Sequence, residues 1–192
     1  DVEFTGDLLS AELGPGLLGQ VYDGLQNPLP LVAEKAGFFL ERGVYVESLS
    51  REIKWDFTPS VKPGDTVYRG DAVGSVPEGP FTHKILVPFD MYGTYTVKSV
   101  TKAGSYTIDE TMAVLEDEKG KSHKITMCFK WPVKRAVDCY SERLEPTETM
   151  VTQTRLIDTF FPVAKGGTYC IPGPFGAGKT VIQHTTSRHA DV

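Results

Sequence analysis

Residues 173–180 carry the clearest chemical signal in this chain, the sequence Gly-Pro-Phe-Gly-Ala-Gly-Lys-Thr. It matches G-x-x-x-x-G-K-[ST], the pattern of a phosphate-binding loop. The glycines allow successive backbone N–H groups to turn into one concavity that suits an anion. The lysine of such a loop reaches the β- and γ-phosphates, and the final hydroxyl binds Mg²⁺.

The predicted site binds ATP or ADP together with Mg²⁺, and Lys179 is its candidate catalytic residue. The nucleotide-binding residues are Gly173, Pro174, Phe175, Gly176, Ala177, Gly178, Lys179, Thr180 and Val181. Thr180 is the candidate Mg²⁺ ligand. The alternative interpretation is a glycine-rich turn that binds nothing.

The segments on either side of the loop have the composition that such a site needs. Residues 168–172 are short, apolar and partly β-branched, so they are predicted to form the leading strand. Residues 180–190 contain neither Gly nor Pro and are predicted to form a helix whose N-terminus faces the phosphates.

A complete ATP-hydrolysing domain of this type also needs an acidic Mg²⁺-binding strand, a catalytic base and several parallel strands. Only twelve residues follow Thr180. The preceding part of the chain does not supply these elements easily, because each parallel crossover takes a dozen or more residues and usually a helix. We therefore expect a fragment of a larger nucleotide-binding protein, with a truncated α/β domain and no ATPase activity of its own.

Composition narrows the possible functions. The net charge of −5 and the pI of about 5.4 argue against a nucleic-acid partner. No stretch approaches the ~20 apolar residues of a membrane span. The three cysteines form no C-x-x-C pair, and the four histidines are scattered, so neither set predicts a disulfide framework or a metal site. These residues are Cys128, Cys139, Cys170, His83, His123, His184 and His189.

The first 42 residues divide into two parts. Residues 1–26 are glycine-rich, with strands predicted at 8–13 and 17–22 on either side of a Gly-Pro-Gly turn. Residues 27–42 are predicted to be a helical connector. Its helix spans residues 28–40, with prolines at its start and apolar residues at helical spacing.

Residues 43–130 change to a β pattern. Short apolar or alternating runs lie at 44–46, 53–57, 85–87, 92–100, 113–115 and 124–130, separated by Gly- and Pro-containing turns. Such spacing is typical of a small barrel or sandwich. We expect this module to be inserted into another domain, with its ends near Arg42 and Trp131 close together. Residues 131–192 are then a connector and the start of the nucleotide-binding domain.

The turn-rich segment 61–76 resembles the repeat of lipoyl- and biotinyl-like barrels. Those domains carry a modified lysine at a hairpin tip, usually flanked by Met or Asp. Lys84 and Lys98 stand in other contexts, so a compact β module without a covalent cofactor is the preferred interpretation. The fold class is therefore mainly β (α+β), with a lipoyl-like barrel or sandwich inserted before the start of a P-loop domain.

Several segments together resemble the catalytic A subunit of the V-type and archaeal-type rotary ATPases. They are residues 12–19, 22–24, 131–133, 157–167 and 171–176, with Gln26, Arg143, Leu144 and Pro146. The inserted β module resembles the bulge, or non-homologous region, of that subunit. The bulge and the Pro-Phe pair inside the phosphate loop distinguish A subunits from the non-catalytic B subunits.

The resemblance implies the catalytic subunit of an ion-translocating ATPase. ATP hydrolysis or synthesis would be coupled to H⁺ or Na⁺ transport in an A₃B₃ ring formed with the B subunit. Central-stalk and peripheral-stalk subunits would be further partners. The ring would form the soluble head on the cytoplasmic side of the membrane, which it would contact only indirectly. The alternative hypothesis is a stand-alone β-barrel interaction module with a non-catalytic P-loop.

Overall fold

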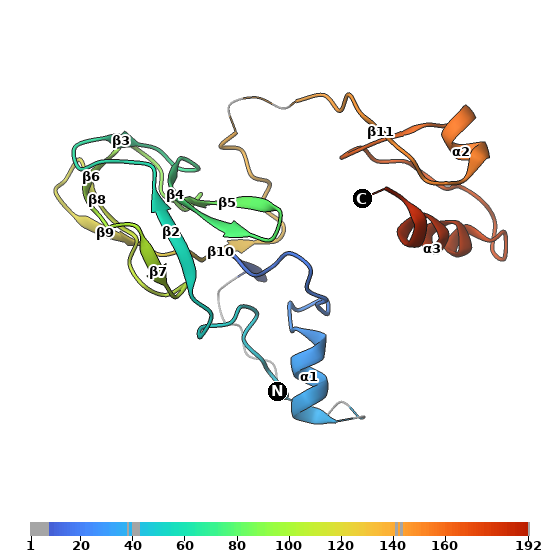
Figure 1. Ribbon diagram of the computed structural model, residues 1–192, viewed down its shortest axis with the longest axis horizontal. Coiled ribbons are helices and arrows are strands. Elements are labelled where there is room, and N and C mark those ends of the chain that lie inside the picture. Colours follow the sequence, from blue (N-terminus) through green and yellow to red (C-terminus); the bar gives the residue numbers. More distant parts are fainter. Residues whose placement is uncertain (1–7, 38, 40–42, 141, 143, 192) are drawn as a thin grey trace. The chain divides into compact units, whose positions relative to one another are not determined.

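Figure 1 shows the computed structural model, which describes residues 8–37, 39, 43–140, 142 and 144–191. The chain divides into two compact units, with the division after Tyr140. The first contains nearly all of the β structure, as the strand-rich sequence predicts, and the second contains the candidate phosphate loop.

Eight strands of the first unit form two four-stranded sheets. Within each sheet, neighbouring strands pair in antiparallel orientation. One sheet has the order β5-β4-β2-β7, with β2 Trp55–Pro59, β4 Ala72–Glu78, β5 Phe81–Leu86 and β7 Gly104–Tyr106. The other has the order β3-β6-β8-β9, with β3 Thr66–Val67, β6 Tyr95–Val100, β8 Ala113–Asp117 and β9 Ser122–Ile125. This is the sandwich that the short, evenly spaced apolar runs predict.

Both sheets contribute to one apolar core. Phe57, Val76 and Ile85 come from the first sheet, and Val97 and Leu115 come from the second. All five side chains are almost completely buried. Since alternate residues of a strand point to opposite faces, the alternating runs in the sequence place these side chains inward and the polar ones outward.

A β-bulge between Ala72 and Gly74 interrupts the pairing of β4 with β5. A Cβ atom on Gly74 would lie 2.2 Å from Cε2 of Phe57. Only glycine therefore allows the β4 backbone to cross the Phe57 ring, and the bulge restores Val76 to the core face.

The sandwich of the two four-stranded sheets, called the barrel from here on, is joined to its flanking chain by a short two-stranded sheet. Strand β1, Ser10–Leu13, pairs with β10, Phe129–Pro132, with Ala11 opposite Trp131. Figure 1 shows these two strands side by side although they lie far apart in the sequence. Residues that precede and follow the barrel therefore meet. The other expected end, near Arg42, lies outside the described residues.

The helical connector is shorter than expected. Helix α1 spans Leu29–Ala36 instead of residues 28–40. It starts after Pro28, carries Pro30 in its first turn, and buries Val32. Gly37 has a φ of 70° and donates its N–H to Ala33 O at 2.9 Å, which ends the helix.

Three strand predictions in the first unit are wrong. Residues 17–22 make only an isolated bridge, between Tyr22 and Pro28, because Gly19 turns the chain with a φ of 75°. Residues 44–46 form no strand, and Tyr45 there is exposed. The run 124–130 is not continuous: Met127 donates to Ile108 O, outside the sheet, and thereby separates β9 from β10.

The connector after β10 remains with the first unit through residue 140. The N–H of Val133 donates to Leu9 O at 3.0 Å, and Arg69 forms an ion pair with Asp138 at 2.8 Å. Trp131 packs edge-on against Phe89 and donates its indole N–H to Arg135 O. Residues 131–140 therefore pack on the barrel.

The second unit is smaller and less regular. It contains β11 Thr149–Met150, α2 Arg155–Phe160, β12 Val163–Ala164 and α3 Lys179–His189, with β11 and β12 antiparallel. The strand predicted at residues 168–172 is not formed. A parallel strand is stabilised by neighbours on its edges, and the described part of this unit contains no strand that pairs there.

Candidate functional site

The backbone of the candidate phosphate loop is fixed by its glycines. Gly176 and Gly178 have φ angles of 78° and 83°, a region that side-chain-bearing residues rarely adopt. Between them, Ala177 donates its N–H to Pro174 O at 3.3 Å and closes a turn. The two glycines and this turn curl the backbone of residues 174–178 locally.

Helix α3 begins at Lys179, directly after the loop, as predicted from the absence of Gly and Pro in residues 180–190. Its N-cap is Gly178, and no side-chain oxygen caps the first turn. The N-terminal N–H groups of a helix carry partial positive charge, so this end of α3 suits an anion.

Lys179 lies across the loop. Its Nζ donates to Gly173 O at 2.8 Å and to Pro174 O at 2.5 Å. These two backbone carbonyls hold the Lys179 ammonium group against the loop. A phosphate bound here would compete for those hydrogen bonds with a stronger, charged acceptor.

The remaining predicted site residues lie on the surface. Phe175, Thr180 and Val181 are exposed. The Thr180 hydroxyl lies in the first turn of α3, and a hard oxygen atom of this kind is a ligand type that Mg²⁺ accepts. Among residues 8–191 that the structure describes, no group of three or more His, Cys, Asp or Glu could hold a metal ion.

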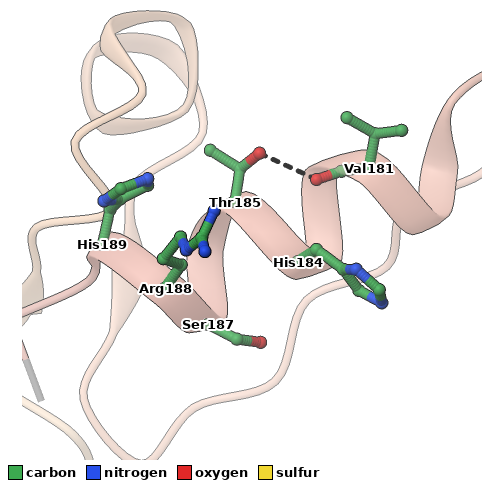
Figure 2. A pocket seen from close by; sticks show the side chains of 6 residues that line it. All are labelled: Val181, His184, Thr185, Ser187, Arg188 and His189. Carbon is green, nitrogen blue, oxygen red and sulfur yellow. Dashed lines mark hydrogen bonds between the residues drawn. The ribbon is translucent and has the colours of Figure 1, made fainter.

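A hollow follows the outer side of α3. Figure 2 shows its lining residues, Val181, His184, Thr185, Ser187, Arg188 and His189, all from this one helix. The two histidines point to different sides of the helix, as their spacing of five predicts. Thr185 donates its hydroxyl to Val181 O at 2.8 Å, so that oxygen is used within the helix.

Polar contacts hold α2 and α3 within the second unit. Asp158 of α2 accepts the N–H and the hydroxyl of the buried Thr152, at 2.9 and 2.6 Å. The Thr152 hydroxyl, followed by its N–H, lowers the pKa of the Asp158 carboxyl. The last residues of α3 are anchored through Asp191, whose carboxylate accepts the Val151 N–H at 2.7 Å.

The two candidate carrier lysines lie within strands. Lys84 is in β5 opposite Ser75, and Lys98 is in β6, where its Nζ donates to Glu116 at 2.8 Å. A carrier lysine stands at a hairpin tip, where a partner enzyme can reach it. Neither position fits that role.

Sequence patterns did not predict three polar groups of the first unit that form several contacts: the buried carboxylates of Glu12 and Glu78 and the guanidinium of Arg51. One signal was available. Glu12 interrupts an otherwise apolar run at residues 8–13, and a charge in such a position is buried only when it is paired. The partners, however, are distant in the sequence.

Comparison with known proteins gives a consistent result. A family model for the ATP synthase alpha/beta subunit barrel-sandwich domain matches residues 46–134, which contain the two sheets. The whole chain aligns with V-type ATP synthase alpha chains: 71% identity over 191 residues in Treponema denticola. Identity is 65% over 191 residues with alpha chain 1 of Treponema pallidum, and 62% over 192 residues in Borrelia recurrentis.

These alignments cover all of this chain but only 32–33% of each relative, so the chain spans about a third of their length. Along that third, the chain is similar to V-type ATP synthase alpha chains, and residues 46–134 match the barrel-sandwich domain of the ATP synthase alpha/beta subunits. In the described part of the chain, no helix is long and apolar enough to cross a membrane.

Proposed function

We propose that this segment of a V-type ATP synthase alpha-chain relative supplies the phosphate-binding loop of a catalytic, nucleotide-binding subunit. The observation that carries the proposal is the loop at residues 173–180. Gly176 and Gly178, both with positive φ, lead into the N-terminus of α3, which no side chain caps. The Lys179 side chain lies across the loop. This geometry suits the β- and γ-phosphates of ATP or ADP.

The chemistry assigned to the loop is electrostatic. Backbone N–H groups of residues 175–180 would bind phosphate oxygens, and Lys179 would stabilise the charge that develops on the transferred phosphoryl group. Mg²⁺, when bound, neutralises charge on the β- and γ-phosphates, and the Thr180 hydroxyl would be one of its ligands. Phe175 and Val181 would border the bound nucleotide.

In the intact protein, this subunit would alternate with B subunits in an A₃B₃ ring and contact central-stalk and peripheral-stalk subunits. ATP hydrolysis or synthesis would be coupled to H⁺ or Na⁺ transport by a head that is cytoplasmic and peripheral to the membrane. The 192 residues alone would not turn over ATP, because the acidic Mg²⁺ strand and the catalytic base of such a site lie elsewhere.

The barrel would have a mechanical or regulatory role. The buried residues of its core all lie between Leu49 and Met127, and Lys84 and Lys98 lie within strands, away from a hairpin tip. Deleting it should leave nucleotide binding in the longer protein largely intact while coupling to ion transport falls. The structure suggests joining Ser50 to Cys128 by a short linker, which retains the β1–β10 pair. Loss of nucleotide binding in a correctly folded deletion variant would place the barrel in the catalytic site.

The central test uses Lys179→Ala in the full-length protein assembled with its B subunit. Loss of one positioned charge from a phosphoryl-transfer site lowers turnover by a factor of ~100 or more. Thr180→Ala should reduce Mg²⁺-dependent turnover more than Mg²⁺-free nucleotide binding. The exposed Thr185→Ala, on the same helix, is the matched control. Wild-type turnover in Lys179→Ala would refute the assignment.

A further inference from the structure

The segment that follows β1 folds back on that strand through a side chain. Gln26 has a φ of 63°, uncommon for a residue with a side chain. Its amide accepts the Glu12 N–H and donates to the Glu12 carbonyl, each at 2.7 Å. Because a carboxamide carries a donor and an acceptor like a peptide group, Gln26 pairs with β1 as a strand neighbour would.

The Glu12 side chain connects β1 to the barrel. Glu12 is 7% exposed, and its carboxylate accepts from Arg51 at 2.5 Å and from the Ser48 hydroxyl at 2.9 Å. Arg51 also reaches Asp109 at 3.1 Å and the Cys128 sulfur at 3.3 Å. Burial acts to lower the Arg51 pKa, but hydrogen bonds to Glu12 and Cys128 outweigh it and raise that pKa.

A second buried carboxylate, from a strand much later in the sequence, binds the segment that follows β1. Glu78, at the end of β4, is 6% exposed. One of its oxygens accepts the N–H groups of Gly16 and Leu18 at 2.6 and 3.2 Å, and the other is 2.7 Å from His83 Nδ1. Gly16 has a φ of 103°, so glycine is required for the turn that presents its N–H.

Tyr22 links the two contacts. Its hydroxyl donates to Ser48 O at 3.0 Å. The Tyr22 pKa is raised by burial first, then by the negative charges of Glu78 and Glu12. The Glu78 carboxylate thus binds the segment directly, whereas Glu12 binds it through its backbone at Gln26. The Glu12 carboxylate binds the barrel side of the junction, at Arg51 and Ser48.

We propose that Glu12 and Glu78 form a two-point clamp that fixes residues 14–28 to the barrel, so that the segment and the barrel move as one body. A hinge at this junction would leave N–H groups and carboxylates without partners in a buried place, which is unfavourable. The consequence for coupling, that load on the barrel passes into β1 and β10, rests on the proposed function; the clamp itself does not.

The test is amide hydrogen exchange on the 192-residue chain. Removing a charged acceptor from a hydrogen bond raises local opening by a factor of roughly ten to a hundred. In Glu78→Ala, exchange at the amides of Gly16 and Leu18 should accelerate by that factor, while Val97 and Leu115 in the core keep wild-type rates. Glu78→Gln, which retains one acceptor oxygen, should fall between wild type and Glu78→Ala. Glu118→Ala, at an exposed turn, is the matched control.

Two results would overturn the clamp. Unchanged exchange at Gly16 and Leu18 in a folded Glu78→Ala chain would show that the carboxylate does not hold the segment. Equal acceleration at Val97 and Leu115 would show a general loss of stability instead of a local release. Gln26→Ala provides an independent readout that leaves the buried Glu78 contacts in place: it should accelerate exchange of the Glu12 amide alone. Neither measurement depends on nucleotide binding, so failure of the clamp is distinguishable from failure of the phosphate loop.

Discussion

The barrel and the unit around the candidate phosphate loop differ in how much apolar surface each buries. The barrel encloses a continuous core from Leu49 to Met127, with Leu115 completely buried. In the described residues 144–191, by contrast, Val163 alone among the hydrophobic residues is buried. Phe160, Phe161 and Val181 are largely exposed. The barrel is therefore stabilised mainly by packing, whereas the second unit relies on local hydrogen bonds.

The two regions also differ in whether their structure depends on distant contacts or on local ones. Some barrel strands need partners that are distant in the sequence, such as β7 for β2 and β6 for β3, and the barrel contains them. The phosphate loop needs only glycines that accept positive φ and a helix that starts behind them, so it forms although residues 168–172 form no strand. A binding loop can thus be defined locally while the sheet around it is not.

The strongest way to test the difference is to remove a core side chain from the barrel. Leu115→Ala should lower the free energy of unfolding by about 2–5 kcal/mol, because it removes buried methyl groups and leaves a cavity. Val181→Ala, at a position 67% exposed, should change it by less than about 0.5 kcal/mol. Urea unfolding followed by Trp55 and Trp131 fluorescence measures the barrel variant, and circular dichroism measures both. Similar losses in the two variants would remove the distinction.

A smaller effect is expected from the best-buried polar residue of the second unit. Thr152→Ala removes the hydroxyl that donates to Asp158 at 2.6 Å. Loss of one such hydrogen bond corresponds to about a fivefold increase in local opening. Hydrogen exchange at the amides of α2 should show this increase, with the barrel amides unchanged. Thr185→Ala on the exposed side of α3 is the control, and an equal response there would contradict the role of Thr152.

The smallest effect concerns pH. Hydrogen bonds lower the pKa of Asp158, first from the Thr152 hydroxyl, and of Asp117 in the barrel, first from the Lys121 N–H. A carboxyl with a depressed folded-state pKa stabilises the fold above its ordinary value of 3.8, and this contribution disappears as the pH falls through the folded value. The stabilising contribution of these two carboxyls should therefore be lost as the pH falls below 3.8.

Carboxyl carbon NMR titration distinguishes the two sites. In Thr152→Ala, the Asp158 pKa should rise towards 3.8 while that of Asp117 stays depressed. An Asp158 pKa that does not respond to this substitution would show that the Thr152 hydroxyl is not its main cause.

The strand errors have a common physical origin. Residues 17–22 and 168–172 have the composition of strands but lack neighbours that pair along their length, and a strand exists only with a partner. The run 124–130 does alternate, but Met127 bonds to Ile108 and the chain passes from one sheet to another. Composition predicts that a segment can be a strand, whereas register and neighbours decide whether it is one.

The sequence by itself determined the mainly β character of residues 43–130, the start of α3, and the glycine-dependent loop before it. These features follow from side-chain alternation, helix propensity and backbone freedom, which act over a few residues. Only the tertiary structure decided that β1 pairs with β10. It also decided that Gln26 and Arg51 bind Glu12, and that Glu78 binds the turn at Gly16. A buried charge is tolerated only where its partners converge, and partners separated by tens of residues are brought together by folding alone.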